Sequence, residues 1–452
     1  MTPDTRLTAF ERRSAFILAA IIAFRMLGLF MLLPVMTTYG ASLHGYTPVL
    51  AGLAVGIYGF TQACLQIPLG RLSDTWGRQR VITLGLVLFA MGALVAALSD
   101  HIYGVIAGRA IQGAGAVSSA ALALAADITA EHRRSKVMAI IGMSIGGAFI
   151  LAFLGGPMLA GFGGLAAVFW ATVALALGGL LLTQFALPRA EPAHSIAGDG
   201  QARWVTLWPL LRQGDLARLS IGIFVLHFVM TAMFMVVPQK LVLLGIARTE
   251  HASIYLPVLI AGAILMAPLL RLAEKRSWHK PVLLLCVAIM AAALGLMALP
   301  SLPLLATGLV LYFMAFNWLE ASLPSWLSRI VPAGHKGTAM GFYASAQFFG
   351  AFAGGAVAGL ALHFGGAEAV LATAVTLTAL WWLIALWQRA LPHWQALHVS
   401  VSADGLAELA TRLRALDGVI EVTPRPEQQS VELRYDARRV SAHALKDLAG
   451  RE

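Results

Sequence analysis

Long apolar runs, separated by short polar connections, follow one another from near the N-terminus to about residue 390. Each run is close to the roughly 20 residues that an α-helix needs to cross the hydrocarbon core of a bilayer. Twelve such runs occur, at about 14–37, 47–69, 81–99, 102–126, 137–160, 165–187, 217–239, 252–272, 280–299, 302–324, 338–362 and 367–390. The first run is too long for the apolar core of a signal peptide, so it counts as a spanning helix. The pattern predicts an all-α polytopic membrane protein with twelve transmembrane helices.

The pattern changes at about Trp394, where apolar runs become short and charges become frequent. Alternation in 397–401, 418–424 and 430–436 predicts three strands, and apolar residues at helical spacing in 406–416 and 440–448 predict two helices. This order predicts a small α+β ferredoxin-like domain at 394–452, in which a fourth strand stays an open question. VSADG follows the first strand in place of the Cys-x-x-Cys of metal-binding domains with this fold, so we expect no metal.

Composition supports a membrane location, and the distribution of charge predicts the orientation. Of the 452 residues 59% are hydrophobic and 12% are charged, against about 25% charged in soluble domains. The net charge of +10 comes largely from alternate connections, for example those with Arg71, Arg78, Arg133, Arg271 and Lys336. Excess Lys and Arg mark cytoplasmic loops, which places both termini in the cytoplasm. The basic charge thus indicates topology, and we expect no nucleic-acid partner.

An internal repeat divides the membrane region into two halves. GRLSDTWGRQRVI (70–82) aligns with LRLAEKRSWHKPV (270–282), at an offset near half of that region. Two similar halves of six helices are a common design of secondary transporters. We therefore predict an N-terminal half at 10–187 and a C-terminal half at 217–390. The Pro- and Gly-containing stretch 188–216 between them predicts a cytoplasmic linker with one short interfacial helix near 204–211.

Three short motifs resemble those of the major facilitator superfamily, and the likeness extends over about residues 10–390. GRLSDTWGRQR (70–80) resembles the motif between the second and third helices, and GRAIQGAG (108–115) resembles the motif of the fourth helix. GGPMLAG (155–161), with Gly156, Pro157 and Gly161, resembles the fifth-helix motif that the family associates with antiporters, although Ala160 replaces a common glycine. The resemblance implies a multi-pass protein of the bacterial inner membrane that works by alternating access.

The first of these motifs predicts a conformational latch. Gly70 and Gly77 provide the backbone freedom that a tight loop between two helices needs. The resemblance implies that Asp74 faces the N-terminal end of the eleventh helix, near Thr338, where exposed N–H groups favour an anion. It also implies that Arg78 pairs with Asp127 at the end of the fourth helix, closing the cytoplasmic side. The alternative is a charged loop that only fixes the topology.

Charged groups inside the spans are the candidates for chemistry, because each costs about 2.5–3.5 kcal/mol or more at the bilayer centre. Glu320 is the one acid well inside an apolar run, Arg25 and Arg109 are the two intramembrane arginines, and His227 lies near mid-span. The resemblance implies that their helices line a central cavity and that Arg109 takes part in proton coupling. We expect Glu320 to carry the proton and His227 to share or relay it. Structural hydrogen bonding remains the alternative for each of them.

Further polar side chains inside the spans are candidates for lining the cavity. They are Arg25, Gln62, Gln66, Gln112, Asn317 and Gln347. The glycine-rich runs lie in apolar helices without a strand before them or a Lys-Ser/Thr after them, which indicates helix packing and not a nucleotide loop. No nucleophile with its base is visible, so we expect no enzymatic activity and no cofactor, with the proton gradient as the energy source.

Three functional interpretations remain open. The first is a proton-coupled antiporter that exports small amphipathic compounds, with lipid, substrate and protons as its partners. The second is an uncoupled facilitator, in which Glu320 and Arg109 only hold helices together. The third is a sensor on a transporter scaffold that signals through the C-terminal domain. In the first case that domain is a module for regulation, self-association or ligand binding.

Overall fold

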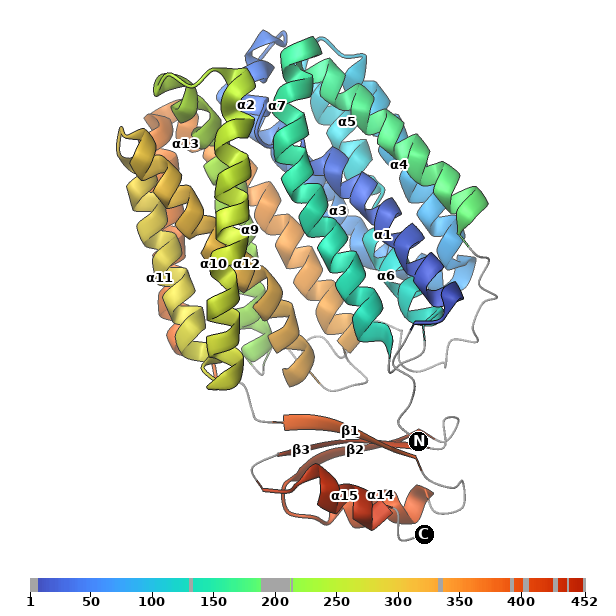
Figure 1. The fold of residues 1–452 in the computed structure, drawn as a ribbon. Helices are drawn as coiled ribbons and strands as arrows, with labels where there is room; N and C mark the ends of the chain where they lie inside the picture. Colours follow the sequence, from blue (N-terminus) through green and yellow to red (C-terminus); the bar gives the residue numbers. More distant parts are fainter. Residues whose placement is uncertain are drawn as a thin grey trace. The chain divides into compact units, whose positions relative to one another are not determined.

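A computed structural model describes residues 7–129, 133–187, 212, 214–331, 336–390, 394–400, 406–425, 430–436 and 439–449. The chain divides into two compact units, Met1–Gln388 and Arg389–Glu452, which are drawn in Figure 1. Each unit is described here by itself.

The first unit is built from helices. They are α1 (Ala9–Phe30), α2 (Met36–Tyr39), α3 (Pro48–Trp76), α4 (Arg78–Ala97), α5 (Ile102–Ala114), α6 (Ser118–Asp127), α7 (Arg134–Leu181), α9 (Asp215–Leu243), α10 (His251–Lys275), α11 (His279–Ala298), α12 (Leu302–Ile330) and α13 (Lys336–Leu386). Short 3-10 turns lie at Gly40–Ser42 and Arg248–Glu250, and α7 continues into a π-helical turn at Leu182–Ala186.

Twelve membrane crossings can be traced through these helices. Nine helices in the described part of the chain are long and apolar enough to span a membrane. Two of the nine are double, because the helical backbone breaks at Gly163 and Gly164 in α7 and at Gly366 in α13. Gly164 and Gly366 have φ angles of 63° and 66°, which glycine adopts without a steric penalty. The shorter α5 and α6 together make the remaining crossing, so the predicted fold class is confirmed.

The start of the first crossing differs from the prediction. The apolar run begins at 14, but α1 begins at Ala9 because Thr8 caps it and Glu11 completes the capping box. The helix ends at Phe30 and is followed by a separate short helix, so it does not continue to residue 37. The interfacial helix expected near 204–211 lies outside the described residues.

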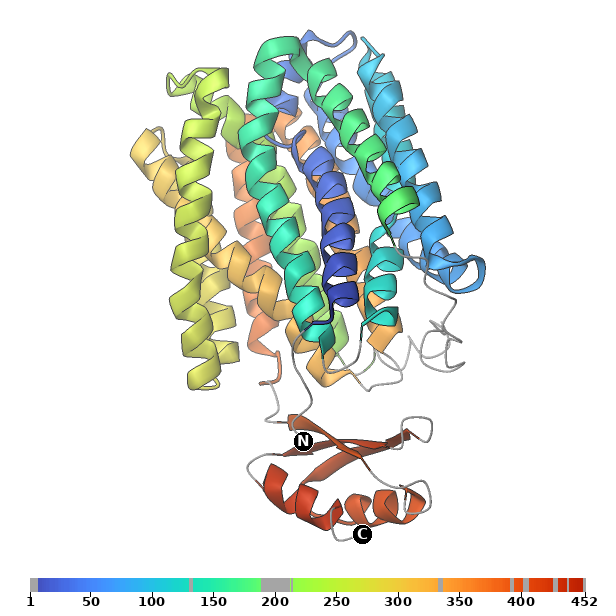
Figure 2. The same cartoon turned by 45° about the vertical axis from the view of Figure 1, so that its right-hand side comes forward.

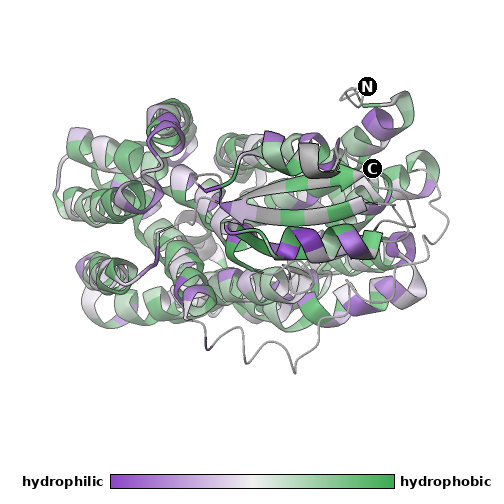
Figure 3. Ribbon diagram, turned by 90° about the horizontal axis from the view of Figure 1, so that it is seen from below, coloured by the Kyte–Doolittle hydropathy of each residue, from purple (hydrophilic) through white to green (hydrophobic). Residues whose placement is uncertain are grey.

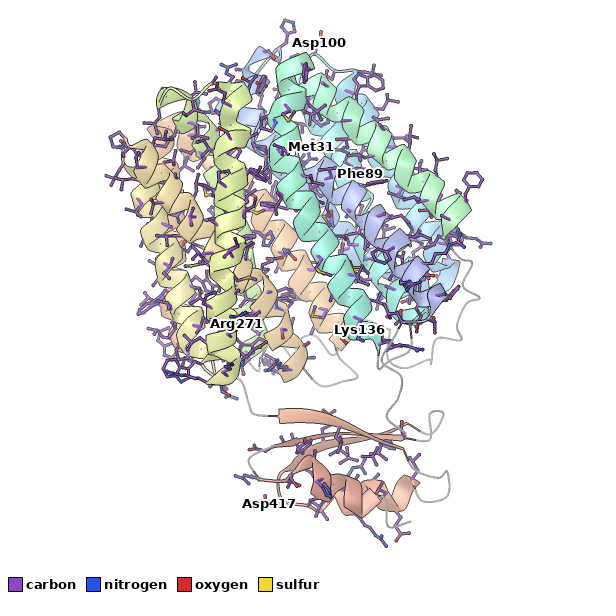
Figure 4. The ribbon with its side chains drawn as sticks, viewed as in Figure 1. Met31, Phe89, Asp100, Lys136, Arg271 and Asp417 are labelled. Carbon is purple, nitrogen blue, oxygen red and sulfur yellow. The ribbon has the colours of Figure 1, made fainter. Side chains whose placement is uncertain are left out.

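The two ends of the helical unit differ in the charged side chains that they carry. Lys136 and Arg271 lie at one end, and Asp100 lies at the other (Figure 4). We call the first the basic end; it also holds the Gly77 turn and the start of α13 at Lys336. The other is called the opposite end. The basic connections predicted from the sequence thus share one end of the unit.

Glycines bring the two halves of this unit into close contact along α3 and α13. A Cβ atom at Gly355 would lie 2.5 Å from the carbonyl oxygen of Gly52, and one at Gly359 would lie 2.7 Å from that of Pro48. Nearer the basic end, the Ser345 hydroxyl donates to the carbonyl of Ala63 across 3.2 Å. The two helices therefore run antiparallel and touch over much of their length.

The halves also meet at the opposite end through α7 and α10. The ring centroids of Phe153 and Tyr255 are 5.4 Å apart, and Phe153 also packs on Phe234 of α9. The guanidinium of Arg248 lies 5.7 Å from the ring centroid of Tyr39. Towards the basic end α7 and α10 diverge, as Figures 1 and 2 show. The structure is thus closed between these two helices at the opposite end.

The second unit is a small α+β domain with the predicted order of elements. It consists of β1 (Trp394–Ser400), α14 (Leu406–Arg414), β2 (Val419–Arg425), β3 (Ser430–Asp436) and α15 (Ala442–Ala449). The strands form an antiparallel sheet in the order β1-β3-β2. Its core includes Val399, Leu409, Leu413, Val422, Val431, Leu433, Tyr435 and Leu445. In Figure 3 its helices carry hydrophilic and hydrophobic residues side by side, as amphipathic helices do.

Candidate functional site

A carboxylate, an amide and an imidazole meet in the second half of the helical unit. Gln347 of α13 donates from Nε2 to Oε1 of Glu320 in α12 at 3.1 Å. The same nitrogen lies 2.9 Å from Nε2 of His227 in α9. The second oxygen of Glu320 is 3.8 Å from that imidazole nitrogen. Three helices thus contribute to one cluster, which we call the Glu320 cluster.

The contacts of this cluster fit one tautomer of the His227 imidazole. The Gln347 nitrogen donates one hydrogen to Glu320, and its second hydrogen needs an acceptor at His227 Nε2. The other ring nitrogen of His227, Nδ1, lies 3.3 Å from the carbonyl oxygen of Ile223 and can donate to it. A neutral His227 with its hydrogen on Nδ1 satisfies both contacts. An extra proton on Nε2 would remove the acceptor that Gln347 uses.

The surroundings of Glu320 are aromatic and hold polar groups without partners. Tyr312 and Tyr343 lie near Glu320, and among the described residues neither buried hydroxyl has a hydrogen-bond partner. Phe316 stacks on Tyr312 with the centroids 5.9 Å apart and packs on the His227 ring. The Glu320 side chain is 39% exposed, although its Oε2 atom is buried and forms no hydrogen bond. The cluster can therefore accept further polar groups or protons.

A second cluster, in the first half, is formed around Arg25 of α1. Its guanidinium donates to the Tyr58 hydroxyl at 2.5 Å, to Gln62 Oε1 at 2.8 Å and to the Ser118 hydroxyl at 2.8 Å. Arg25 is 2% exposed and Gln62 is fully buried. These partners are neutral, so hydrogen bonds, together with the rings of Tyr58 and Phe89 whose centroids lie 5.8 Å from the guanidinium carbon, replace the water that the buried charge has lost.

Arg109 of α5 belongs to the same cluster through its contact with Tyr58. Its guanidinium carbon lies 4.7 Å from the ring centroid of Tyr58, and it donates to Gln112 Oε1 at 3.0 Å and to the Ala54 carbonyl at 3.4 Å. Tyr58 therefore contacts two buried arginines. Among the described residues, no carboxylate forms an ion pair with Arg25 or Arg109.

The break between α5 and α6 helps to build this arginine cluster. The chain leaves the helix at Gly115, where a Cβ atom would clash with the backbone of Gly85 in α4, and resumes at Ser118. Ser118 is therefore the first residue of α6, and its hydroxyl contacts Arg25. Non-helical backbone is tolerated in a membrane only where protein or a water-filled cavity surrounds it. The glycines of the 108–115 segment provide such close packing.

In the loop motif (70–80) at the basic end, one arginine pairs with two acidic side chains. Arg78 forms ion pairs with Asp74 and, across 3.1 Å, with Asp127 at the end of α6. It also donates to the Ser73 hydroxyl at 2.6 Å. The Gly77 φ angle of 100° is in the region that favours glycine. Gly70 lies one turn before Asp74 on α3 and packs near Ser119.

The contact expected between Asp74 and the eleventh helix is not visible within the described residues. Ser345 pairs with Ala63, and Gly341 packs on Ile67. Residues 332–335, which precede α13, lie outside the described residues. The role of Asp74 as a latch therefore stays a prediction.

The remaining predicted residues have other surroundings. Gln66 of α3 is buried with its Oε1 unpaired, and Asn317 of α12 is partly exposed. In α7, Pro157 is buried, and a Cβ atom at Gly156 would lie 2.6 Å from the Met31 carbonyl oxygen. A Cβ atom at Gly161 would lie 2.8 Å from Thr249 in the other half. These two glycines thus allow α7 to approach its neighbours closely.

Sequence reasoning did not identify the tyrosines of either cluster. Tyr58, Tyr312 and Tyr343 lie in apolar spans, where a hydroxyl needs a partner, and this property was a usable signal. Nothing in the sequence indicated Ser118. Within the described ranges, no group of three His, Cys, Asp or Glu residues could hold a metal ion. The clusters are suited to moving protons and binding polar groups of a solute.

Twelve crossings in one compact unit, with polar clusters buried between them, define a multi-pass membrane transport protein. A family model described as Major Facilitator Superfamily matches residues 18–355. The chain belongs to the Major Facilitator Superfamily and is a secondary transporter by homology. It is 37% identical over 439 residues to the inner membrane transport protein YajR of Escherichia coli (strain K12), and the alignment covers 96% of each chain.

Solved structures of two transporters share the fold. The nucleoside transporter NupG and a D-xylose-proton symporter each match with a TM-score of 0.66. The matches cover 83% of this chain and 98% of each of those chains, at 16% and 14% sequence identity. At these identities the likeness concerns the fold alone. The family also implies a lipid environment and a small-molecule substrate.

Proposed function

We propose that this protein is a proton-coupled antiporter that exports small amphipathic compounds across the bacterial inner membrane by alternating access. The proton gradient is its energy source, and it needs no cofactor. The Glu320 cluster is the observation that carries this proposal. It joins a carboxylate and an imidazole through the amide of Gln347, from three different helices.

Glu320 is suited to the role of proton carrier because of its position. It lies 39% exposed on a spanning helix, so a proton can reach it, while one of its oxygens is buried without a hydrogen bond. A charged carboxylate inside a membrane is costly and pairs with a partner or marks a pathway. His227, whose imidazole is 3.8 Å away, is the partner that shares or relays the proton. Arg109 assists release of the proton when the cavity rearranges.

Aromatic side chains around Glu320 support an amphipathic substrate. Phe316 and Tyr312 stack on each other near the carboxylate, and although both rings are buried in this conformation, they would combine apolar contact with one acidic group if the cavity rearranged around a solute. Such a combination binds molecules with an apolar body and a polar or cationic group. Antiport agrees with the residues Gly156, Pro157 and Gly161 in α7, which resemble the antiporter motif.

The conformation agrees with a site that opens at the basic end. The contacts of Phe153 with Tyr255 and Phe234 close the opposite end between α7 and α10. With the basic end in the cytoplasm, as the positive-inside rule indicates, this is the inward-facing state. In the outward-facing state, Asp74 contacts the N-terminal end of the eleventh helix near Thr338, and this contact together with the Arg78–Asp127 pair acts as the cytoplasmic latch.

Glu320→Gln tests the proposal, because glutamine keeps the shape of the neutral acid but cannot titrate. In proteoliposomes with an imposed pH gradient, we expect the wild-type protein to move compounds from a panel against their own gradients. The variant should lose this driven transport and keep exchange down a substrate gradient. Driven transport that survives in Glu320→Gln would contradict the proposal and favour a structural role for this residue.

A further inference from the structure

Gln347 holds a central position between the proton site and the contact of the two halves. Its one amide nitrogen contacts both Glu320 and His227, at 3.1 and 2.9 Å. Two residues before it on α13, Ser345 donates its hydroxyl to Ala63 of α3 in the other half. Less than one turn after it, Gly350 packs against the backbone of Phe224 in α9. The side chain thus lies on the helix that both α9 and α3 contact.

We propose that Gln347 is a positioning residue that links the location of the proton to the packing of α13 against α3. This inference rests on the proposed function of Glu320 as proton carrier. Gln347 does not itself bind a transported proton, because an amide does not titrate at physiological pH. It responds to protonation of its two neighbours.

The response follows from hydrogen-bond donors and acceptors. In the present arrangement, the Gln347 amide donates to an oxygen of Glu320 and to an unprotonated nitrogen of His227. A proton that binds to His227 Nε2 turns that acceptor into a donor, which then faces an N–H group, and the orientation with the Gln347 oxygen towards His227 becomes favourable. A proton that binds to Glu320 leaves a carboxyl group that is a weaker acceptor for the Gln347 N–H and also donates. Protonation therefore changes which orientation of Gln347 is stable, and no covalent bond is made or broken.

The packing of α13 transmits this change. Gly350 and Gly354 bring α13 against the backbone of α9, and Gly355 and Gly359 bring it against the backbone of α3. Contacts without intervening side chains have little room to absorb a displacement, because protein interiors are close-packed. A change in the side-chain bonds at Gln347 therefore alters the balance between packing on α9 and packing on α3. The contacts between the halves that would respond are the bond from Ser345 to Ala63 and the close packing of Phe348 on Gly59.

The titratable groups that face Gln347 are few. Among the described residues they are His227 from α9 and Glu320 from α12, which contact the amide, and Tyr312 from α12 and Tyr343 from α13, which lie near Glu320. The described contacts of α3 with this stretch of α13 come from Gly59, Phe60, Ala63 and Ile67, which do not titrate. The pH dependence of the link therefore belongs to Glu320 and His227.

Two measurements on the full chain test the inference without a known substrate. Infrared spectra recorded against pH follow the protonated carboxyl of Glu320, whose band is assigned by its loss in Glu320→Gln. Spin labels report the distance between α7 and α10 near the basic end, at Met143 and Ile264, which are 70% and 65% exposed. Both labelling sites are changed to cysteine in a chain in which Cys64 and Cys286 are replaced by alanine.

In the wild-type background we expect the carboxyl band and the distance distribution to change at the same pH midpoint. In Gln347→Met, which keeps the length of the side chain without its amide, the two midpoints should separate by about one pH unit or more, a tenfold change in the linked equilibrium. Gln184→Met is the matched control, because it removes the amide that donates to Thr83 far from the cluster. In Gln184→Met the pH midpoints of the carboxyl band and of the distance distribution should coincide.

Coincident midpoints in Gln347→Met would overturn the inference. If that variant does not fold, Gln347→Asn replaces it, since this amide is one methylene too short to reach both neighbours, and coincident midpoints there would overturn the inference equally. A wild-type protein whose Glu320 band does not change with pH would contradict the proposed function itself. The two failures are therefore distinguishable.

Discussion

At the scale of single residues, the arginine cluster shows how a membrane protein keeps two positive charges inside. Arg25 and Arg109 both contact Tyr58: Arg25 donates to its hydroxyl, and the guanidinium carbon of Arg109 lies 4.7 Å from its ring centroid. Because no ion pair with a carboxylate is seen for them among the described residues, neutral partners must satisfy their donors. Each partner then contributes to stability through charge-assisted hydrogen bonds.

Tyr58→Phe should therefore destabilise the protein although it preserves the ring. The change leaves an N–H group of Arg25 without the acceptor that lies 2.5 Å away. Hydrogen bonds to charged groups contribute about 1.5–3 kcal/mol, so we expect a lower apparent unfolding temperature in detergent solution. Tyr103→Phe is the control, because Tyr103 is 62% exposed and its hydroxyl is not part of the arginine cluster. Equal unfolding temperatures for the two variants would show that the hydroxyl of Tyr58 contributes nothing.

The sequence identified the charged members of both clusters and not their organisation. Arg25, Arg109, His227 and Glu320 are conspicuous because charged or titratable groups are rare inside apolar runs. The structure places the two arginines in one half and the acid with the histidine in the other. Gln347 could be predicted only as a cavity residue, since nothing in a single chain shows that it contacts two helices at once.

At the scale of elements, α13 is the helix on which the contact between the halves depends. Its glycines allow backbone-to-backbone contact with α3 at Gly52 and with α9 at Phe228. The apolar runs at 338–362 and 367–390 predicted the two crossings that α13 contains, because nearly every position in them is apolar. They could not predict the partner helices, because glycine-rich faces are typical of any close helix contact in membranes. The break between α5 and α6 was likewise hidden within one continuous apolar run, at 102–126, whereas the break in α7 falls between the predicted runs 137–160 and 165–187.

Gly355→Ala should separate α3 from α13 towards the opposite end. The added methyl group would lie 2.5 Å from the Gly52 carbonyl oxygen, which is too close for an unshifted backbone. We expect fewer molecules closed at the opposite end, measured as a longer distance between spin labels placed there on α7 and α10. Gly147→Ala is the matched control, because its Cβ atom would have no neighbour within 4 Å. A distance distribution that Gly355→Ala leaves unchanged would show that this contact does not limit closure.

At the scale of the whole molecule, two units with separate cores share one chain. The core of the second unit includes Leu409, Leu413, Leu433 and Leu445, all contributed by residues after Arg389. Alternation and helical spacing sufficed to predict its order of elements. The pairing order β1-β3-β2 needed the structure, because strand neighbours are set by contacts between distant residues.

Residues 389–452 should fold without the helical unit. A core formed within the unit and a continuous antiparallel sheet support this, although a domain of about 60 residues is only marginally stable. The isolated fragment should give a dispersed amide spectrum by NMR and a cooperative thermal transition. Amide signals collapsed into the random-coil range would mean that the domain needs the helices as a packing partner.

The account as a whole depends on one claim, that solute movement is coupled to protons through Glu320. The most direct measurement follows the pH inside proteoliposomes with a trapped dye while compounds from a panel are added, for the wild-type protein and for Glu320→Gln. We predict that transported compounds cause proton movement in the opposite direction in the wild type, and that this movement is absent in the variant. Solute flux without proton movement in the wild type would contradict the account and identify a facilitator. An absence of flux for every compound would instead favour a sensor.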